Sequence, residues 1–383
     1  MSPPTYLAVD IGTGTQDIYL LRAGLSPENG FKLIMPSPTM VIRGQIQRAT
    51  RARETLLLTG VTMGGGPCAW AAEAHVRAGL SLYATPDAAR TFNDDLDHVE
   101  REIGIQVVSE DEASRLKDVT RIRLGDFDWH ALHTGFAAFG HDLRPSAVGV
   151  AVFDHGAAPS GMSDRQFRFD YLEARIRQAN RLSAFAYRSA EVPASLTRLQ
   201  AVADSAGDLD APLVLMDTAP AAVLGALLDP CIKGQERQMV INIGNFHTLA
   251  FRLGPRGVEG VFEHHTGLLT QQRLEAYLIA FADGSLTRQA VFADNGHGAL
   301  LLDPTPLSLD SGKGRPAVTG PRRSLMQGSV LQPCFAAPFG DMMLAGCFGL
   351  LQAMGDLLPD AATAIHGSLA DHVTDHAPWD LEG

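Results

Sequence analysis

Residues 241–248 read INIGNFHT and run from an apolar strand into a glycine turn. The residues QMV lead into this stretch, and HTLAFRL continues beyond the turn as a second strand. Strand-forming residues on both sides of a glycine turn predict a β-hairpin. A similar pattern stands near the N-terminus, where YLAVDIGTGTQDIYLL predicts a strand, a tight turn and a strand. We therefore predict two matching hairpins, over residues 6–22 and 238–253, one in each of two lobes.

The turn of the first hairpin combines two glycines with two hydroxyl side chains, Thr13 and Thr15. Backbone N–H groups that are exposed in such a turn bind anions, so the hairpin can wrap phosphate groups. Asp10 ends the first strand and could hold the water of a bound Mg²⁺, because this ion prefers one or two carboxylates together with phosphate oxygens. A plain β-hairpin with a solvated turn is the alternative.

The composition describes a globular chain with more than one core. A chain of 383 residues is too long for one simple core, so two domains or lobes are expected. The formal net charge of −12 disfavours nucleic acid and anionic membranes as partners, because both reward clustered lysine and arginine. We see no signal peptide and no apolar stretch of about 20 residues without a charge or a proline, so we expect a cytoplasmic protein without a membrane span.

Four cysteines, at positions 68, 231, 334 and 347, are spread along the chain without a CxxC motif. This spacing favours reduced, buried thiols. A cluster shared by Cys334 and Cys347 is the alternative.

Several histidines stand beside glycines in expected turns, as in DHG, EHHTG and NGHG. If these side chains converge, they could bind Zn²⁺, Fe²⁺ or a small anionic substrate. Histidines that cap loops or fill cores are the alternative. We name as a candidate pocket for a small polar substrate the glycine-rich turn and the residues of these motifs: Gly64, Gly65, Asp154, His155, His265 and His297.

The order of these parts resembles one superfamily, the actin-like ATPase group of acetate and sugar kinases, heat-shock chaperones and actin. Its members share five sequence landmarks in a fixed order, and the chain has a candidate for each. These are a first phosphate loop at 9–15, a first connecting helix at 217–226, a second phosphate loop at 242–248, an adenosine turn at 318–322 and a second connecting helix at 340–346. The resemblance implies two α/β lobes, each with a ribonuclease-H-like sheet, and a nucleotide cleft between them.

The resemblance also implies that ATP and Mg²⁺ occupy this cleft. Small residues in the connecting helices would let the lobes cross closely and hinge, which fits Ala221, Ala222, Gly225, Ala345 and Gly346. The residues that the landmarks assign to nucleotide binding are Gly12, Thr13, Gly14, Thr15, Asn242, Gly244, Asn245, Thr248, Gly320, Arg322 and Gly340.

Within this superfamily the chain resembles a bacterial and archaeal family, domain of unknown function 1786, whose members are often labelled pyruvate formate-lyase activating proteins. The phrases that resemble it are DxGTGTQD, TMGGGP, DHG, NIGNFHT, HHTG and NGHGALLLDP. That label implies radical-SAM chemistry, which needs three cysteines on one loop. The sequence has no such loop, so we do not adopt the label as an activity.

The departures from the superfamily pattern bear on mechanism. Kinases and chaperones of the group usually keep an aspartate in both hairpins, whereas the second hairpin here carries Asn242. An amide can hydrogen-bond a metal-bound water but adds no charge to a Mg²⁺ site. We therefore expect Asp10 to be the principal metal ligand and name Asp10, Asp217 and His247 as catalytic candidates. His247 could bind a phosphate, bind a metal or act as a general base, or it could simply cap the turn.

We predict a first lobe over residues 1–234 with an inserted segment of about residues 60–200, a second lobe over 235–340, and a C-terminal helix over 341–383 that returns to the first lobe. Three functions fit this sequence. The chain could be a slow ATPase whose lobe closure activates or matures a partner enzyme, a small-molecule kinase that transfers the γ-phosphate, or a non-catalytic nucleotide sensor or scaffold.

Overall fold

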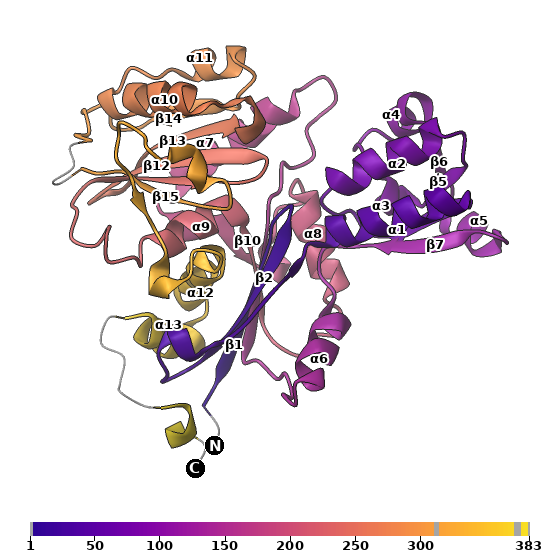
Figure 1. Cartoon of the computed structure of the whole chain (residues 1–383), viewed down its shortest axis with the longest axis horizontal. Helices are drawn as coiled ribbons and strands as arrows, with labels where there is room; N and C mark the ends of the chain where they lie inside the picture. The colour runs from indigo at the N-terminus through magenta and orange to yellow at the C-terminus, as the bar shows by residue number, and fades with distance from the viewer. Residues whose placement is uncertain (1–2, 310–313, 371–376, 382–383) are drawn as a thin grey trace.

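The computed structural model describes residues 3–309, 314–370 and 377–381. Three sheets follow one another across the molecule, two of six strands and one of four. Figure 1 shows the second six-stranded sheet at the upper left, the first near the centre and the four-stranded sheet at the right. The two larger sheets form the two lobes.

The first lobe is built on a mixed sheet with the order β3-β2-β1-β8-β10-β9. The first three strands form an antiparallel meander, and β8 and β10 then run parallel to β1. Both parallel strands and the centre of β1 are buried, which explains their continuous apolar sequences. The strands are β1 (Thr5–Ile11), β2 (Thr15–Arg22), β3 (Phe31–Pro36), β8 (Ala147–Val152), β9 (Ala186–Arg188) and β10 (Leu213–Asp217).

The second lobe repeats this arrangement in the order β14-β13-β12-β11-β15-β16. Its strands β11, β12 and β13 form an antiparallel meander like β1, β2 and β3, and β15 runs parallel to β11 as β8 does to β1. This repeated topology confirms the predicted fold class of two ribonuclease-H-like α/β lobes. The strands are β11 (Gln238–Ile243), β12 (His247–Gly254), β13 (Gly257–His265), β14 (Gly298–Leu301), β15 (Ala317–Thr319) and β16 (Cys334–Phe335).

Two helices join the lobes, α9 (Thr218–Ala226) and α12 (Ala345–Leu357), and they cross in direct contact. A Cβ atom on Gly225 would overlap the carbonyl oxygen of Ala345, and one on Gly349 would overlap that of Ala221. The two backbones therefore approach as closely as only glycine allows. Helix α12 also packs on β1 and β8 of the first lobe.

The four-stranded sheet, in the order β6-β5-β4-β7, is wholly parallel. Its strands are β4 (Leu56–Gly60), β5 (Leu82–Ala84), β6 (Gln106–Val107) and β7 (Thr120–Leu124), and α1 (Pro38–Ala52) and α2 (Pro67–Arg77) pack against each other beside it. The chain returns to the first lobe at β8. The segment predicted as the insertion, about residues 60–200, thus contains most of this sheet and also strands β8 and β9 of the first lobe.

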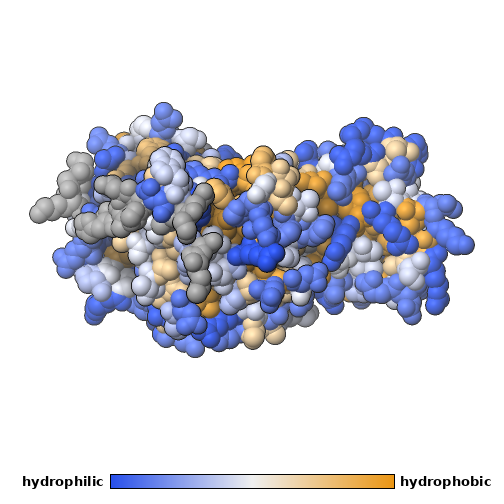
Figure 2. Space-filling model, turned by 90° about the horizontal axis from the view of Figure 1, so that it is seen from below, coloured by the Kyte–Doolittle hydropathy of each residue, from blue (hydrophilic) through white to orange (hydrophobic). Residues whose placement is uncertain are grey.

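Nine further α-helices are present among the described residues, of which α3, α7, α8 and α11 contact strands and α13 packs on α12. They are α3 (Pro86–Ala89), α4 (Leu96–His98), α5 (Glu110–Arg115), α6 (Trp129–Ala138), α7 (Asp164–Gln178), α8 (Thr197–Ser205), α10 (Gln271–Asp283), α11 (Arg288–Ala293) and α13 (Pro359–Leu369). Among the described residues, no helix has the length and apolar character needed to cross a bilayer. Figure 2 shows one face of the molecule on which hydrophilic residues predominate toward the two ends.

The cysteines differ from the sequence-based expectation of reduced thiols. Cys231, just after α9, and Cys334, in β16, form a disulfide with their Cα atoms 6.5 Å apart. Only Cys68 and Cys347 are free, and both are buried. Because 103 positions separate the bonded pair, no local sequence motif could reveal it.

Candidate functional site

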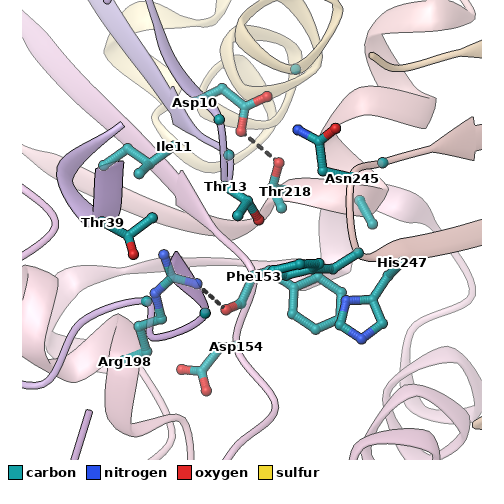
Figure 3. A pocket seen from close by; sticks show the side chains of 18 of the residues that line it. Asp10, Ile11, Thr13, Thr39, Phe153, Asp154, Arg198, Thr218, Asn245 and His247 are labelled. Atoms are coloured by element: carbon teal, nitrogen blue, oxygen red, sulfur yellow. Dashed lines mark hydrogen bonds between the residues drawn. The ribbon is translucent and has the colours of Figure 1, made fainter. Parts of the chain in front are cut away.

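The two glycine hairpins close in the same way. The N–H of Gly12 donates to the carbonyl of Thr15 at 2.9 Å, and the N–H of Gly244 donates to the carbonyl of His247 at 2.9 Å. Both turns line one cavity of about 400 Å³ between the lobes. Figure 3 shows Thr13 from one turn and Asn245 from the other entering the same space.

The turns also approach each other closely. A Cβ atom on Gly14 would lie 3.2 Å from the side-chain nitrogen of Asn245. The first turn belongs to one lobe and the second turn to the other, so the two lobes come into close contact at this point.

Asp10 lies at the inner end of this cavity. Its carboxylate accepts a hydrogen bond of 2.5 Å from the hydroxyl of Thr218, the first residue of α9, as Figure 3 shows. Gly346 lies in the first turn of α12, and a Cβ atom on it would overlap this carboxylate. A glycine is therefore needed where α12 contacts Asp10. Burial raises the pKa of Asp10 to about 7.

A second carboxylate lies beside Asp10. The register of β1 and β2 pairs Asp10 with Asp17, and burial together with the charge of Asp10 raises the pKa of Asp17 to about 8. One carboxylate oxygen of Asp17 is buried without a hydrogen-bond partner among the described residues. A desolvated carboxylate beside a second carboxylate favours the arrival of a cation.

On the opposite side, Asn242 occupies in β11 the position that Asp10 occupies in β1. It lines the cavity and pairs in parallel register with Thr319 of β15. Gly320 follows with a positive φ of 96°, and a Cβ atom there would crowd the side-chain oxygen of Asn242. The turn after β15 therefore closes over the second hairpin.

Most of the sequence-predicted residues meet in this cavity. Its lining includes Asp10, Gly12, Thr13, Gly14, Thr15, Gly64, Gly65, Asp154, His155, Asn242, Gly244, Asn245, His247 and Gly320. Six others do not line it, namely Asp217, Thr248, His265, His297, Arg322 and Gly340. Thr248 is buried behind the turn, where its hydroxyl bonds that of Thr266 at 2.9 Å, and the N–H of Arg322 donates to the carbonyl of Ile243.

Asp217, a catalytic candidate from the sequence, is buried below the cavity. Its carboxylate pairs with the guanidinium of Arg168, and it also accepts the N–H of Ala219 at 3.1 Å as the N-cap of α9. The Nε atom of Arg168 lies 3.5 Å from the carboxylate of Glu263. Burial raises the pKa of Glu263 to about 7. Asp217 is thus engaged in a buried ionic group and does not reach the cavity.

His247 lies against the first lobe. Its ring stacks on that of Phe153, with centroids 4.1 Å apart and planes at 2°. The rings of His155, His265 and His297 surround it, with centroids 5.0–5.1 Å from its own. Burial, together with the neighbouring histidines and Arg168, lowers the pKa of His247 well below its ordinary value.

The register of the second sheet explains this gathering. Strand β12 pairs His247 with His265 of β13, and the backbone N–H of His297 donates to the carbonyl of Glu263. His264, the neighbour of His265, points to the other face and contacts Asp294. Alternation along a strand thus separates two adjacent histidines.

The cavity continues beside the four-stranded sheet. There the guanidinium of Arg198 pairs with the carboxylate of Asp126 at 2.7 Å and donates to the carbonyl of Phe153 at 2.6 Å. Asp154 is buried, and its carboxylate accepts the N–H groups of Gly156 and Leu199, each at 2.8 Å. Its hydrogen bonds hold the loop after β8 in place.

Sequence reasoning missed several residues that shape the site, chiefly Phe153, Arg168, Arg198 and Thr218. Phe153 directly precedes the DHG motif, and Thr218 directly follows Asp217. Their positions beside candidate site residues are therefore a signal in the sequence for these two residues. Arg168 and Arg198 stand in helices that are rich in polar residues, α7 and α8. No local pattern distinguishes a buried arginine in such a helix from an exposed one.

Comparison with protein families matches residues 63–325 to the family described as "Putative pyruvate format-lyase activating enzyme (DUF1786)". The matched region covers more than half of the chain. The chain belongs to this family. The DUF1786 match extends from the glycine-rich turn through the second hairpin to the turn after β15, and it confirms the resemblance found in the sequence.

Solved structures that are similar to this DUF1786 protein have low sequence identity. The ethanolamine utilization protein EutJ from Carboxydothermus hydrogenoformans is 12% identical, with a TM-score of 0.31 and coverage of 91% of this chain and 90% of that one. The ROK hexokinase from Thermus thermophilus is 13% identical, with a TM-score of 0.24 and coverage of 93% and 78%. The apo pSK41 ParM protein is 12% identical, with a TM-score of 0.30 and coverage of 93% and 98%.

The comparison with curated proteins found no match. The fold assignment therefore rests on the repeated topology of the two sheets.

Proposed function

We propose that this protein binds Mg²⁺–ATP between its two glycine hairpins and hydrolyses it slowly, and that lobe closure around the nucleotide activates or matures a partner enzyme. The observation that carries the proposal is the pair of matching turns. The bonds from Gly12 to Thr15 and from Gly244 to His247 are equivalent, and both turns line one cavity. Two sets of turn N–H groups on opposite sides of one space suit an extended polyphosphate.

The residues present fit Mg²⁺ and ATP. Asp10 and Asp17 provide carboxylates at the inner end of the cavity, with an unpartnered oxygen on Asp17. Asp10 would hold the water of a bound Mg²⁺, and Asn242 would orient a second water without adding charge. Thr218 keeps the Asp10 carboxylate in place through its hydrogen bond.

Each turn has its own task in this proposal. The turn from Gly12 to Thr15 would hold one side of the phosphate chain and the turn from Gly244 to His247 the other. Gly320 lies where the resemblance puts the adenosine. Bound Mg²⁺–ATP supplies a γ-phosphoryl group that water can attack.

The proposal of a partner protein depends on the way in which the lobes can hinge. The lobes meet at glycine-lined crossings, Gly225 against Ala345 and Gly349 against Ala221, so a hinge at this point needs no repacking of large side chains. A nucleotide that binds one lobe angle better shifts the protein toward that conformation. A partner protein that recognises this conformation then binds more tightly when the nucleotide is present.

The first test is a thermal melt with Mg²⁺–ATP. A ligand that binds only the folded state should stabilise the wild type by about 2.7 kcal/mol at a hundredfold excess over its Kd. Gly12→Val places a side chain where the turn must approach phosphate and should abolish the stabilisation. Gly267→Val is the matched control, because a Cβ atom there meets nothing within 4 Å. Absence of any shift in the wild type at millimolar ATP would refute nucleotide binding.

Phosphate transfer to a small molecule is the second candidate. It is favoured by the continuation of the cavity along the four-stranded sheet, past Gly64, Gly65 and Arg198. An acceptor screen with ATP distinguishes the candidates, since a kinase yields a phosphorylated product and an ATPase yields inorganic phosphate. Binding without either product would support the sensor alternative.

A further inference from the structure

Three histidines converge beside the cavity although they are far apart in the sequence. One ligand nitrogen from each of His155, His247 and His297 lies within 4.8 Å of the other two. His155 follows β8 in the first lobe, whereas His247 begins β12 and His297 precedes β14 in the second lobe. The cluster therefore spans the boundary between the lobes.

These nitrogens lack the partners that structural histidines usually have. His297 is fully buried, and neither of its ring nitrogens has a hydrogen-bond partner among the described residues. The Nε2 atom of His247 is also buried and has no hydrogen-bond partner in the part of the chain that the structure describes. His75 shows the contrast, because both of its nitrogens are bonded, to Thr50 and to the carbonyl of Ser81. A buried polar group without a partner costs free energy, so its retention needs an explanation.

Three arginines, Arg165, Arg168 and Arg198, lie close enough to oppose a positive charge on these rings. Arg168 pairs with the buried carboxylates of Asp217 and Glu263, and Arg198 pairs with that of Asp126. These carboxylates reduce the repulsion that Arg168 and Arg198 exert on a bound cation.

We infer that His155, His247 and His297 form a binding site for a divalent transition-metal ion such as Zn²⁺ or Fe²⁺, with an open coordination position toward the cavity. Imidazole donors select these metals over Mg²⁺, which prefers oxygen ligands. Three protein ligands with one open position are typical of catalytic rather than structural zinc sites. The three nitrogens already lie within 4.8 Å of one another, which is the proximity that a common ion with Zn–N distances of about 2.0–2.1 Å needs.

The neighbouring His265 is a further potential ligand, with its ring centroid 4.7 Å from that of His297. The second candidate group in the described chain, Asp229 with Cys231 and Cys334, is different. Its sulfur atoms are joined in a disulfide and cannot act as thiolate ligands.

The test uses full-length, tag-free protein that has been treated with a chelator, dialysed and kept without reductant or nucleotide. Zn²⁺ is titrated by calorimetry, and Co²⁺ provides an absorption spectrum of the site. We expect one ion per chain, no binding of Mg²⁺ at this site, and at least about a 100-fold loss of Zn²⁺ affinity in His155→Ala, since loss of supporting groups alone costs 10- to 100-fold. His133→Ala is the matched control, because His133 is also partly exposed but lies outside the cluster, beside Asp142 and Trp129.

The inference is overturned if the wild type binds no Zn²⁺ in the titration, or if His155→Ala binds Zn²⁺ as tightly as His133→Ala does. The thermal transition of each variant shows whether it is folded. X-ray absorption of the Zn²⁺-loaded wild type gives a result that depends on no variant: three nitrogen neighbours support the site, and oxygen neighbours alone refute it. Because nucleotide is absent, the outcome is independent of ATP binding.

Discussion

The imidazole ring of His247 stacks on the phenyl ring of Phe153, with parallel planes and centroids 4.1 Å apart. His247 belongs to the second hairpin and Phe153 directly follows β8 of the first lobe, so the stack joins the two halves of the molecule. Figure 3 shows the two rings side by side at the edge of the cavity. His247 therefore has a packing role in addition to any chemical one.

This stack predicts a difference between two substitutions. His247→Ala should lower the free energy of unfolding by about 1 kcal/mol or more, because an aromatic pair contributes about 0.5–1.5 kcal/mol beyond the area it buries. His247→Phe keeps a ring over Phe153 and should restore most of this loss, while removing the nitrogen ligand. Urea denaturation measures both. Equal stability of the two variants would show that the stack contributes little.

The position of Asp10 predicts its importance for turnover. Asp10→Asn should retain most of its ATP affinity but lower the hydrolysis rate by about 10²- to 10³-fold, the usual cost of losing one contact to the transition state. Asn242→Asp should increase the rate, because it adds charge to the opposite side of the proposed Mg²⁺ site. Phosphate release under saturating Mg²⁺–ATP is the measurement.

Gly267→Val serves again as the control for nonspecific effects on this rate. Normal turnover in Asp10→Asn together with an inactive His247→Phe would transfer the chemistry from the carboxylate to the histidine. In that case the metal would act through the imidazole cluster.

The disulfide predicts a thiol count. Unfolded but unreduced protein should expose two reactive thiols, those of Cys68 and Cys347, and reduction should raise the number to four. The double substitution Cys231→Ser and Cys334→Ser removes the disulfide. It should lower the free energy of unfolding by about 2–4 kcal/mol, because the disulfide closes a long loop and so restricts the unfolded chain. Cys68→Ser is the control that changes a buried sulfur without changing a crosslink. Four reactive thiols before reduction would contradict the pairing.

His75 predicts a pH dependence of stability. It is buried between α1 and α2, and burial lowers its pKa below the ordinary value of 6.5. The unfolded chain therefore takes up a proton first as the pH falls, and the stability that His75 contributes is complete above about pH 6.5 and declines below it. His75→Gln should flatten this part of the curve of unfolding free energy against pH.

Measurement at pH 8 isolates the packing effect of the same substitution, since the imidazole is neutral there in both states. The test is the difference between wild type and variant at pH 8 compared with that at pH 5. An unchanged difference would show that His75 does not titrate on unfolding in this range.

The sequence by itself determined the elements whose cause is local. Gly12 and Gly244 interrupt runs of strand-forming residues, and a glycine turn between two strands has few alternatives. The small residues Gly225 and Ala345 marked helices that had to approach closely, and the order of these parts predicted two lobes and a cleft. These patterns therefore predict that the residues of both turns face one cavity.

Only the tertiary structure decided which distant side chains meet. Asp217 was expected in the cavity, but it is buried outside it and pairs with Arg168 of α7. The sequence of a helix does not show which of its arginines faces inward. The convergence of His155, His247 and His297 depends on strand register and on the angle between the lobes, and the bond between Cys231 and Cys334 joins residues 103 positions apart. Such contacts are set by the packing of whole sheets, whereas sequence patterns report only the periodicity of one element at a time.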